Sequence, residues 1–266
     1  MFNKVYLILL IIFVAASCRK REIDKDIQPS VDYLLIQNNL ARIVPLVIHT
    51  VNNKEQLNII FADSIDTLNS CAKYFYLSGD TVDINNQEIE FKITFDMCMD
   101  SDSVLKNGTI NCKINNYLKF DGGECRISFD DFSIDGNELE GIIFVTKKPG
   151  NEFTLQTIEL FQRFGTRRIL YDGEMDYSMS YGALDDEMND DVLTSVDNGV
   201  LTDIYNNEAK INNPGISKSL GCSYFTNGLV EIVNDKNVTQ VLDIGNGTCD
   251  NEIEITFEDE SFIIRL

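Results

Sequence analysis

The chain has 266 residues, of which 44% are hydrophobic and 10% aromatic, with only 4 prolines. That is enough apolar material for one large or two small cores, and it excludes a mainly disordered, collagen-like or coiled-coil chain. Asp and Glu total 43 against 22 Lys and Arg, so the formal net charge is −21. We expect no nucleic-acid partner, because phosphate binding requires a basic surface.

Residues 1–17 have the features of a lipoprotein signal peptide. Lys4 precedes a nearly continuous apolar run from Val5 to Ala16, which is shorter than the ~20 residues that cross a bilayer. Two small residues, Ala16 and Ser17, stand directly before Cys18 and resemble the lipobox cut by bacterial lipoprotein signal peptidase, although Ala15 stands where leucine is usual. Cys18 is therefore the expected lipid attachment site. The alternative is ordinary secretion with Cys18 as a free or paired thiol.

Residues 18–29 read as a polar tether, and residues 30–53 as the one clear helix. Apolar residues recur there at spacings of three and four, the period of a helix: Tyr33, Ile36, Leu40, Ile43, Val47 and Val51. Pro45 should kink this helix or divide it in two, because proline removes a backbone donor. His49 is the single histidine of the chain, and we expect a packed or half-exposed helix residue there rather than a catalyst.

From residue 54 onward, β-branched and aromatic residues alternate in short runs. Glycine pairs that tolerate tight hairpin turns separate the runs: Asn107-Gly108, Asp121-Gly122-Gly123, Asp135-Gly136, Asp172-Gly173, Asn198-Gly199, Asn227-Gly228 and Asn246-Gly247. Strands are expected at 88–95, 108–114, 125–132, 138–146, 153–162, 228–233, 239–244, 252–257 and 261–266. The predicted fold is mainly β, an antiparallel sandwich or curved sheets with one N-terminal helix.

Six cysteines remain after Cys18, and an even number in an exported chain indicates three disulfides. Sequence neighbours flanked by strand and turn signals predict the pairs Cys71–Cys98, Cys112–Cys125 and Cys222–Cys249, although a bridge such as Cys71–Cys222 stays open. The first and third pairs share a spacing of 27 residues and similar flanking residues. Two similar halves are therefore an option, a first β region at 54–148 and a second at 149–266. Zinc is disfavoured by the wide cysteine spacing and the single histidine.

The stretch LGCSYFTNGLVEI, followed by LDIGNGTCDNEIEITF and FIIRL, resembles a group of uncharacterised cell-envelope lipoproteins of Bacteroidota. Upstream, ITFDMCMDSD and FDDFSIDGNELEGIIFVT are similar to the same group, whereas Cys112 and Cys125 depart from its pattern. The resemblance covers roughly residues 30–266 and is most specific at 245–251. It implies an envelope location and an all-β fold, and no activity.

Phosphate-binding loops, a Gly-x-Ser-x-Gly elbow and a His-Glu-x-x-His helix are all absent from the sequence. Calcium could bind carboxylates in two acidic clusters, although neither fits the EF-hand pattern and solvated loops are the simpler interpretation: Asp96, Asp100 and Asp102, and Asp185, Asp186, Glu187, Asp190 and Asp191. We therefore expect no cofactor. The sequence favours a non-enzymatic binding or scaffolding protein, anchored to a bacterial envelope membrane by its lipid, with a protein or glycan ligand. The alternative is a carboxylate-dependent hydrolase acting on glycans or peptides at the cell surface.

Overall fold

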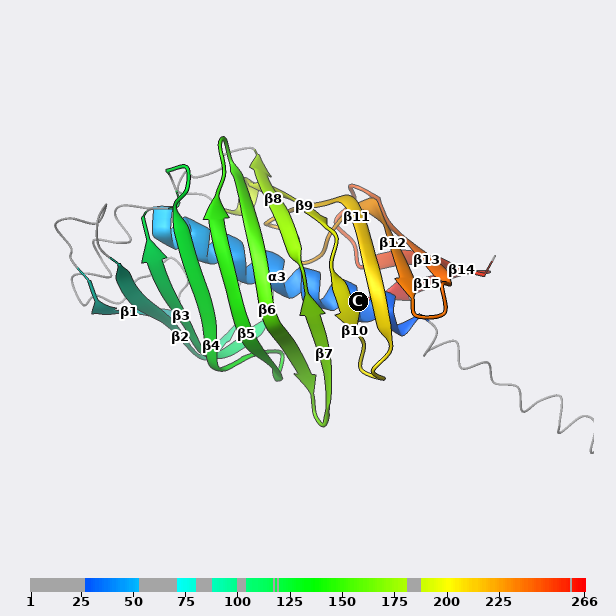
Figure 1. The fold of residues 1–266 in the computed structure, drawn as a ribbon, viewed down its shortest axis with the longest axis horizontal. Helices are drawn as coiled ribbons and strands as arrows, with labels where there is room; N and C mark the ends of the chain where they lie inside the picture. The colour runs from blue at the N-terminus through cyan, green and yellow to red at the C-terminus, as the bar shows by residue number, and fades with distance from the viewer. Residues whose placement is uncertain are drawn as a thin grey trace, which may run out of the picture.

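The computed structural model describes residues 27–52, 71–79, 88–99, 104–180 except 117 and 119, 188–258 and 260–266. One long helix, α3 (Gln28–Asn52), precedes the strands. The strands form one antiparallel sheet, and a short 3₁₀ turn, η1 (Met188–Asp190), precedes β9. The mainly β prediction with one N-terminal helix is confirmed, in its curved-sheet form (Figure 1).

The strands follow one another across the sheet almost entirely in chain order. Their bounds are β1 (Ala72–Ser78), β2 (Ile89–Met99), β3 (Leu105–Asn115), β4 (Glu124–Ile134), β5 (Asn137–Lys147), β6 (Glu152–Phe164), β7 (Arg167–Asp172), β8 (Glu174–Ser180), β9 (Val192–Asp197), β10 (Val200–Thr202), β11 (Glu208–Ser219), β12 (Asn227–Asn234), β13 (Thr239–Asn246), β14 (Glu252–Phe257) and β15 (Glu260–Arg265). All nine predicted strands are present, most of them slightly longer than expected. Strands β1 and β7 to β11 were not predicted from the sequence.

Near the middle of the sheet, two pairs of short strands each act as one long strand with a break. Strands β7 and β8 flank Gly173 and both pair with β6. Strands β9 and β10 flank Asn198-Gly199 and both pair with β11. Pairing of β8 with β9 and of β7 with β10 keeps a single register across both breaks. The whole sheet is thus an up-and-down meander.

Four of the seven glycine pairs expected to be hairpin turns lie within or between collinear strands instead: Asn107-Gly108, Asp172-Gly173, Asn198-Gly199 and Asn227-Gly228. At Asn107-Gly108 the pairing of β3 with β4 shifts register, and Gly108 has φ 94° opposite Asp131 with φ 48°. A Cβ on Gly108 would collide with the Asp131 carbonyl oxygen. Such bulges bend a strand and increase its twist. The glycines that were expected in hairpin turns, but lie within strands, therefore contribute to the curvature of the sheet.

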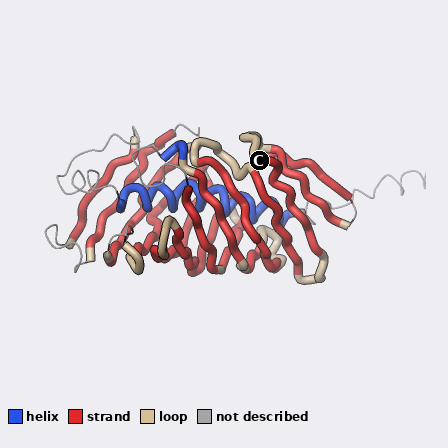
Figure 2. The backbone as a smooth tube through the Cα atoms, turned by 90° about the horizontal axis from the view of Figure 1, so that it is seen from above, coloured by secondary structure: helices blue, strands red, loops and turns tan. Residues whose placement is uncertain are grey.

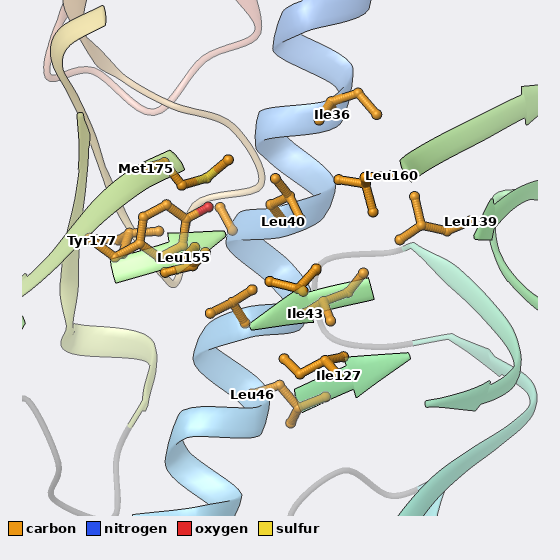
Figure 3. Packing of buried hydrophobic residues seen from close by; sticks show 14 of the residues in the cluster. Ile36, Leu40, Ile43, Leu46, Ile127, Leu139, Leu155, Leu160, Met175 and Tyr177 are labelled. Carbon is orange, nitrogen blue, oxygen red and sulfur yellow. The ribbon is translucent and has the colours of Figure 1, made fainter. Parts of the chain in front are cut away.

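Helix α3 lies along the concave side of the curved sheet and crosses its strands (Figures 1 and 2). Ile36, Leu40 and Ile43 point into the core between helix and sheet, toward residues such as Leu155 and Leu160 (Figure 3). Each fully buried aliphatic side chain of this kind stabilises the fold by about 1.5–3 kcal/mol. The helix is therefore the central element of the core.

The expected division of the helix at Pro45 is wrong, because α3 continues through it as a single helix. Pro45 is itself buried in the core. Tertiary packing stabilises most protein helices more than intrinsic propensity does, and packing along the sheet here outweighs the missing backbone donor. The helix also begins at Gln28, inside the segment read as tether.

The expected junction between two β regions falls in the turn between β5 and β6. These two strands pair from Leu139–Gln162 to Lys147–Phe153, so the sheet is continuous across the junction. Near its two ends, hairpins β1–β2 and β12–β13 are each closed by a disulfide that spans 27 residues. The repeated cysteine spacing thus corresponds to two similarly stapled hairpins within a single sheet.

Candidate functional site

A cluster of polar side chains lies between α3 and the middle of the sheet, around Asp197 at the end of β9. The Oδ2 atom of Asp197 accepts hydrogen bonds from the Tyr33 hydroxyl at 2.6 Å, from Gln37 Nε2 at 3.0 Å and from Asn213 Nδ2 at 3.2 Å. Ser195 Oγ donates to Gln37 Oε1 at 3.3 Å. All five residues are buried. The cluster thus joins the helix to β9 and β11 through one carboxylate.

Two tyrosines of the sheet complete this cluster. In the described part of the chain, the hydroxyls of Tyr171 and Tyr177 and the Oδ1 atom of Asp197 make no hydrogen bond of normal geometry. Tyr171 and Asp197 nevertheless lie close enough for their side chains to interact. The Tyr171 ring lies over Gly173, between β7 and β8, and over Gly199, between β9 and β10. These two glycines are neighbours, and neither has a side chain that would occupy the space of the ring. Three buried polar atoms without a well-formed hydrogen bond are unusual in a packed core, where such groups are normally hydrogen-bonded.

Burial changes the acidity of these groups. It raises the pKa of Asp197 from 3.8 to about 6, although hydrogen bonds from Tyr33 and Asn213 act in the opposite direction. Burial, followed by the nearby Asp197 charge, raises the pKa of Tyr171 and Tyr177 well above the usual tyrosine value. Asp197 can therefore exchange a proton close to neutral pH, whereas the phenols stay protonated.

Polar contacts continue toward the first turn of α3. Asp32 accepts hydrogen bonds from the Ile204 backbone N–H at 3.0 Å and from Gln28 Nε2 at 2.7 Å. Burial raises the pKa of Asp32 to about 6, against the effect of these two bonds. Ser30 donates from its hydroxyl to Gln240 of β13. The start of the helix is thus fixed to β13 and to the turn after β10.

At the far end of α3, His49 lies 2.7 Å through Nε2 from the Asp191 Oδ2 atom, and both side chains are buried. The prediction of a packed helix histidine is confirmed. Asp191 was expected in an exposed acidic loop, and this is wrong because its carboxylate bonds the helix. Asp96 and Asp190 are exposed, and the remaining members of the two acidic clusters lie outside the described residues: Asp100, Asp102, Asp185, Asp186 and Glu187.

The polar residues below the helix were not predicted as a site from the sequence. Asp197 directly precedes Asn198-Gly199, a pair expected to form a hairpin turn. The available signal was alternation along β9, where Leu193, Ser195 and Asp197 occupy successive inward positions. On the helix, Gln37 follows Tyr33 by one turn, which places both polar groups on the same face.

The described residues include an open hollow of about 440 Å³ on the β13–β14 side of the sheet. It is lined in part by Asp243, Asp250, Glu252 and Glu254. Two of these carboxylates accept backbone hydrogen bonds, Asp243 from Gly245 at 2.9 Å and Asp250 from Glu252 at 3.1 Å. The described part of the chain holds no group of three or more His, Cys, Asp or Glu arranged to bind a metal ion.

Apolar side chains also lie on the sheet face that points away from α3. Ile142 of β5 pairs with Ile158 of β6, and Phe144 lies two residues further along β5. Phe144 is 36% exposed and Ile158 is 42% exposed. We call these three residues the outer-face patch. Exposed apolar groups that cluster in this way commonly mark interaction surfaces.

Two of the three predicted disulfides are confirmed: Cys71–Cys98, with Cα atoms 5.3 Å apart, and Cys222–Cys249, with Cα atoms 5.8 Å apart. The third is wrong, because Cys112 and Cys125 are buried free thiols.

The reason is strand register. Cys112 pairs with Ile127, and Cys125 pairs with Ile114. The cysteines are therefore diagonal neighbours, typically about 7–8 Å apart, whereas a disulfide needs Cα atoms about 4.4–6.8 Å apart. Burial, and then the adjacent Cys125 thiol, raise the pKa of Cys112 well above its usual value.

Cys18 lies outside the described residues. Two disulfides indicate an oxidising, extracytoplasmic compartment. By length and composition, α3 is the one helix among the described residues that could cross a membrane, and 89% of its most apolar window is buried within this fold.

Comparison with protein-family models finds no match, and comparisons with curated proteins and with solved structures find no significant match.

Proposed function

We propose that the protein is a lipid-anchored cell-envelope protein with a non-enzymatic binding or scaffolding role. The observation that carries this proposal is the position of α3, which fills the concave side of the sheet where a cleft would otherwise form. The opposite face remains for partners, and it carries the outer-face patch of Ile142, Phe144 and Ile158. The partner class that fits is a protein or glycan at the cell surface.

Lipid anchoring through Cys18 is supported by the apolar run and small residues before it and by the disulfides of an oxidising compartment. Replacing Cys18 by serine should move the protein from the membrane fraction to the soluble fraction, because its acyl chains would be lost. Fractionation followed by immunoblotting measures this. Cys112→Ser is the matched control, since it removes a buried thiol far from the amino terminus and should leave the protein in the membrane. A Cys18→Ser protein that still sediments with the envelope contradicts the lipid anchor.

The second candidate is a carboxylate-dependent hydrolase, and the open hollow with Asp243 and Glu254 is the observation in its favour. These residues pair across β13 and β14, so their carboxylates are neighbours. Glycoside hydrolysis uses two carboxyl groups about 5–10 Å apart. Assays on glycan and peptide substrates test this. Hydrolysis that is lost on Glu254→Gln, and retained in the outer-surface control Glu231→Gln, would favour the enzyme over the binding protein.

A further inference from the structure

Strand β15 has one side that is not paired with any described strand, because it bonds to β14 only. The Leu266 N–H donates to the Asn251 carbonyl at 3.1 Å, which fixes the alternation of hydrogen bonds between these strands. In an antiparallel pair, every second residue directs its backbone groups to the neighbour. Phe262, Ile264 and Leu266 therefore bond toward β14. The N–H and C=O groups of Ser261, Ile263 and Arg265 point outward along the free edge.

The inner face of this edge is apolar, and on the outer face the apolar Ile263 lies between Ser261 and Arg265. Ile263, on the face away from α3, is 68% exposed, the largest value among the large hydrophobic side chains of the described residues. On the opposite face, Phe262, Ile264 and Leu266 are only partly buried against the core. An edge strand with outward backbone groups and apolar side chains is a template for pairing with another strand.

We propose that β15 pairs antiparallel with β15 of a second copy of this chain, about a two-fold axis at Ile263. In this register Ile263 faces Ile263 of the second copy. Ser261 of each copy faces Arg265 of the other. All three outward residues of each chain are then paired, which gives six backbone hydrogen bonds. Shifting the register by two residues leaves one outward residue of each chain without a partner. The free edge is thus complementary to itself, as a two-fold interface requires.

The side chains agree with this register. Phe262 meets Ile264 of the second copy on the inner face, which extends the apolar core across the interface. Arg265 lies opposite Ser261 rather than another arginine, so no like charges stand directly across from each other. The net charge of −21 on each chain opposes association. At about 0.15 M salt, however, charges more than about 8 Å apart are largely screened.

Site-specific cross-linking of the full chain in expressing cells tests the proposal. Ile263→Cys should form a disulfide-linked dimer under mild oxidation, because directly opposed residues of a hydrogen-bonded pair lie about 5.5 Å apart. Leu229→Cys is the matched control, since Leu229 is 53% exposed on the same face but lies on β12. We expect at least about tenfold more dimer from Ile263→Cys on non-reducing gels, because only that residue faces its own copy across a two-fold axis.

A second measurement tests the register. Mixing a Ser261→Cys chain with an Arg265→Cys chain should give more cross-linked dimer than either chain alone. Equal cross-linking of Ile263→Cys and Leu229→Cys would overturn the proposal, as would a product whose mass corresponds to a different protein. A Ser261→Cys chain that cross-links to itself as strongly as to Arg265→Cys would overturn it too.

Discussion

Replacing Asp197 by asparagine should change how the stability of the protein depends on pH. The Asp197 pKa is about 6 in the folded protein against 3.8 for the free side chain. A shift of this size corresponds to about 3 kcal/mol. Because the folded pKa is raised, the protonated form contributes this stability below about pH 4, and the contribution is lost as the pH rises through about 6.

The asparagine side chain of the variant would carry no charge at any of these pH values. Its amide oxygen could still accept from Tyr33 and Gln37, and its NH₂ group would face the region of the Tyr171 and Tyr177 hydroxyls. The free energy of unfolding of Asp197→Asn, relative to the unmodified protein, should therefore rise by about 2–3 kcal/mol between about pH 4 and about pH 7. Asp32, whose pKa is also about 6, is present in both proteins and cancels in the difference.

Urea denaturation followed by circular dichroism, with the disulfides intact, measures this difference at each pH. The control is Asp176→Asn, an exposed aspartate of the neighbouring strand β8, which reports the general effect of removing one negative charge. A stability difference for Asp197→Asn that does not vary with pH would refute a raised pKa of Asp197, as would a variant that becomes relatively less stable as the pH rises.

Other predictions concern the thiols, the sheet centre and the acidic loop. Cys112 and Cys125 should react with a thiol reagent only after denaturation, because both are buried; no reaction even in denaturant would indicate a third disulfide. Gly199→Ala should lower the free energy of unfolding by about 1–3 kcal/mol, because its methyl group would overlap the Tyr171 ring; an unchanged urea midpoint would contradict this. Calorimetry should show no saturable calcium binding, and micromolar binding lost on Asp190→Asn would argue against a solvated loop.

Regular alternation made most of the sheet predictable from the sequence. In the strand Glu252–Phe257, for example, isoleucines alternate with charged and polar residues. Strand β11 was missed because Asn212, Asn213, Pro214 and Gly215 interrupt its apolar pattern. Its register shifts in this segment against both neighbours. A local pattern does not reveal that two flanking strands will hold such a segment in the sheet.

The glycine pairs also show why the sequence alone does not distinguish a hairpin turn from a bulge. Asn-Gly and Asp-Gly favour positive φ angles, and both hairpin turns and bulges use them. Asp135 and Gly136, with φ 51° and 76°, form the turn between β4 and β5, whereas Asn107-Gly108 lies in a bulge. The choice depends on which residue of the adjacent strand stands opposite, and this is a property of the assembled sheet. The same ambiguity concealed Asp197 beside Asn198-Gly199.

The polar contacts of α3 have a structural consequence that apolar packing alone would not supply. Nearly every side chain of the helix is buried, so burial distinguishes poorly between alternative positions along the sheet. A slip of one turn, about 5.4 Å, would instead separate His49 from Asp191. It would also leave only one of Tyr33 and Gln37 within reach of Asp197, because these two residues are one turn apart. Leaving a buried charge without its partners costs about 3–5 kcal/mol. The buried carboxylates of Asp191 and Asp197 therefore favour one position of the helix along the sheet. The ionised form of Asp197 lowers the stability of the fold above about pH 6, and Asp197→Asn should recover this loss.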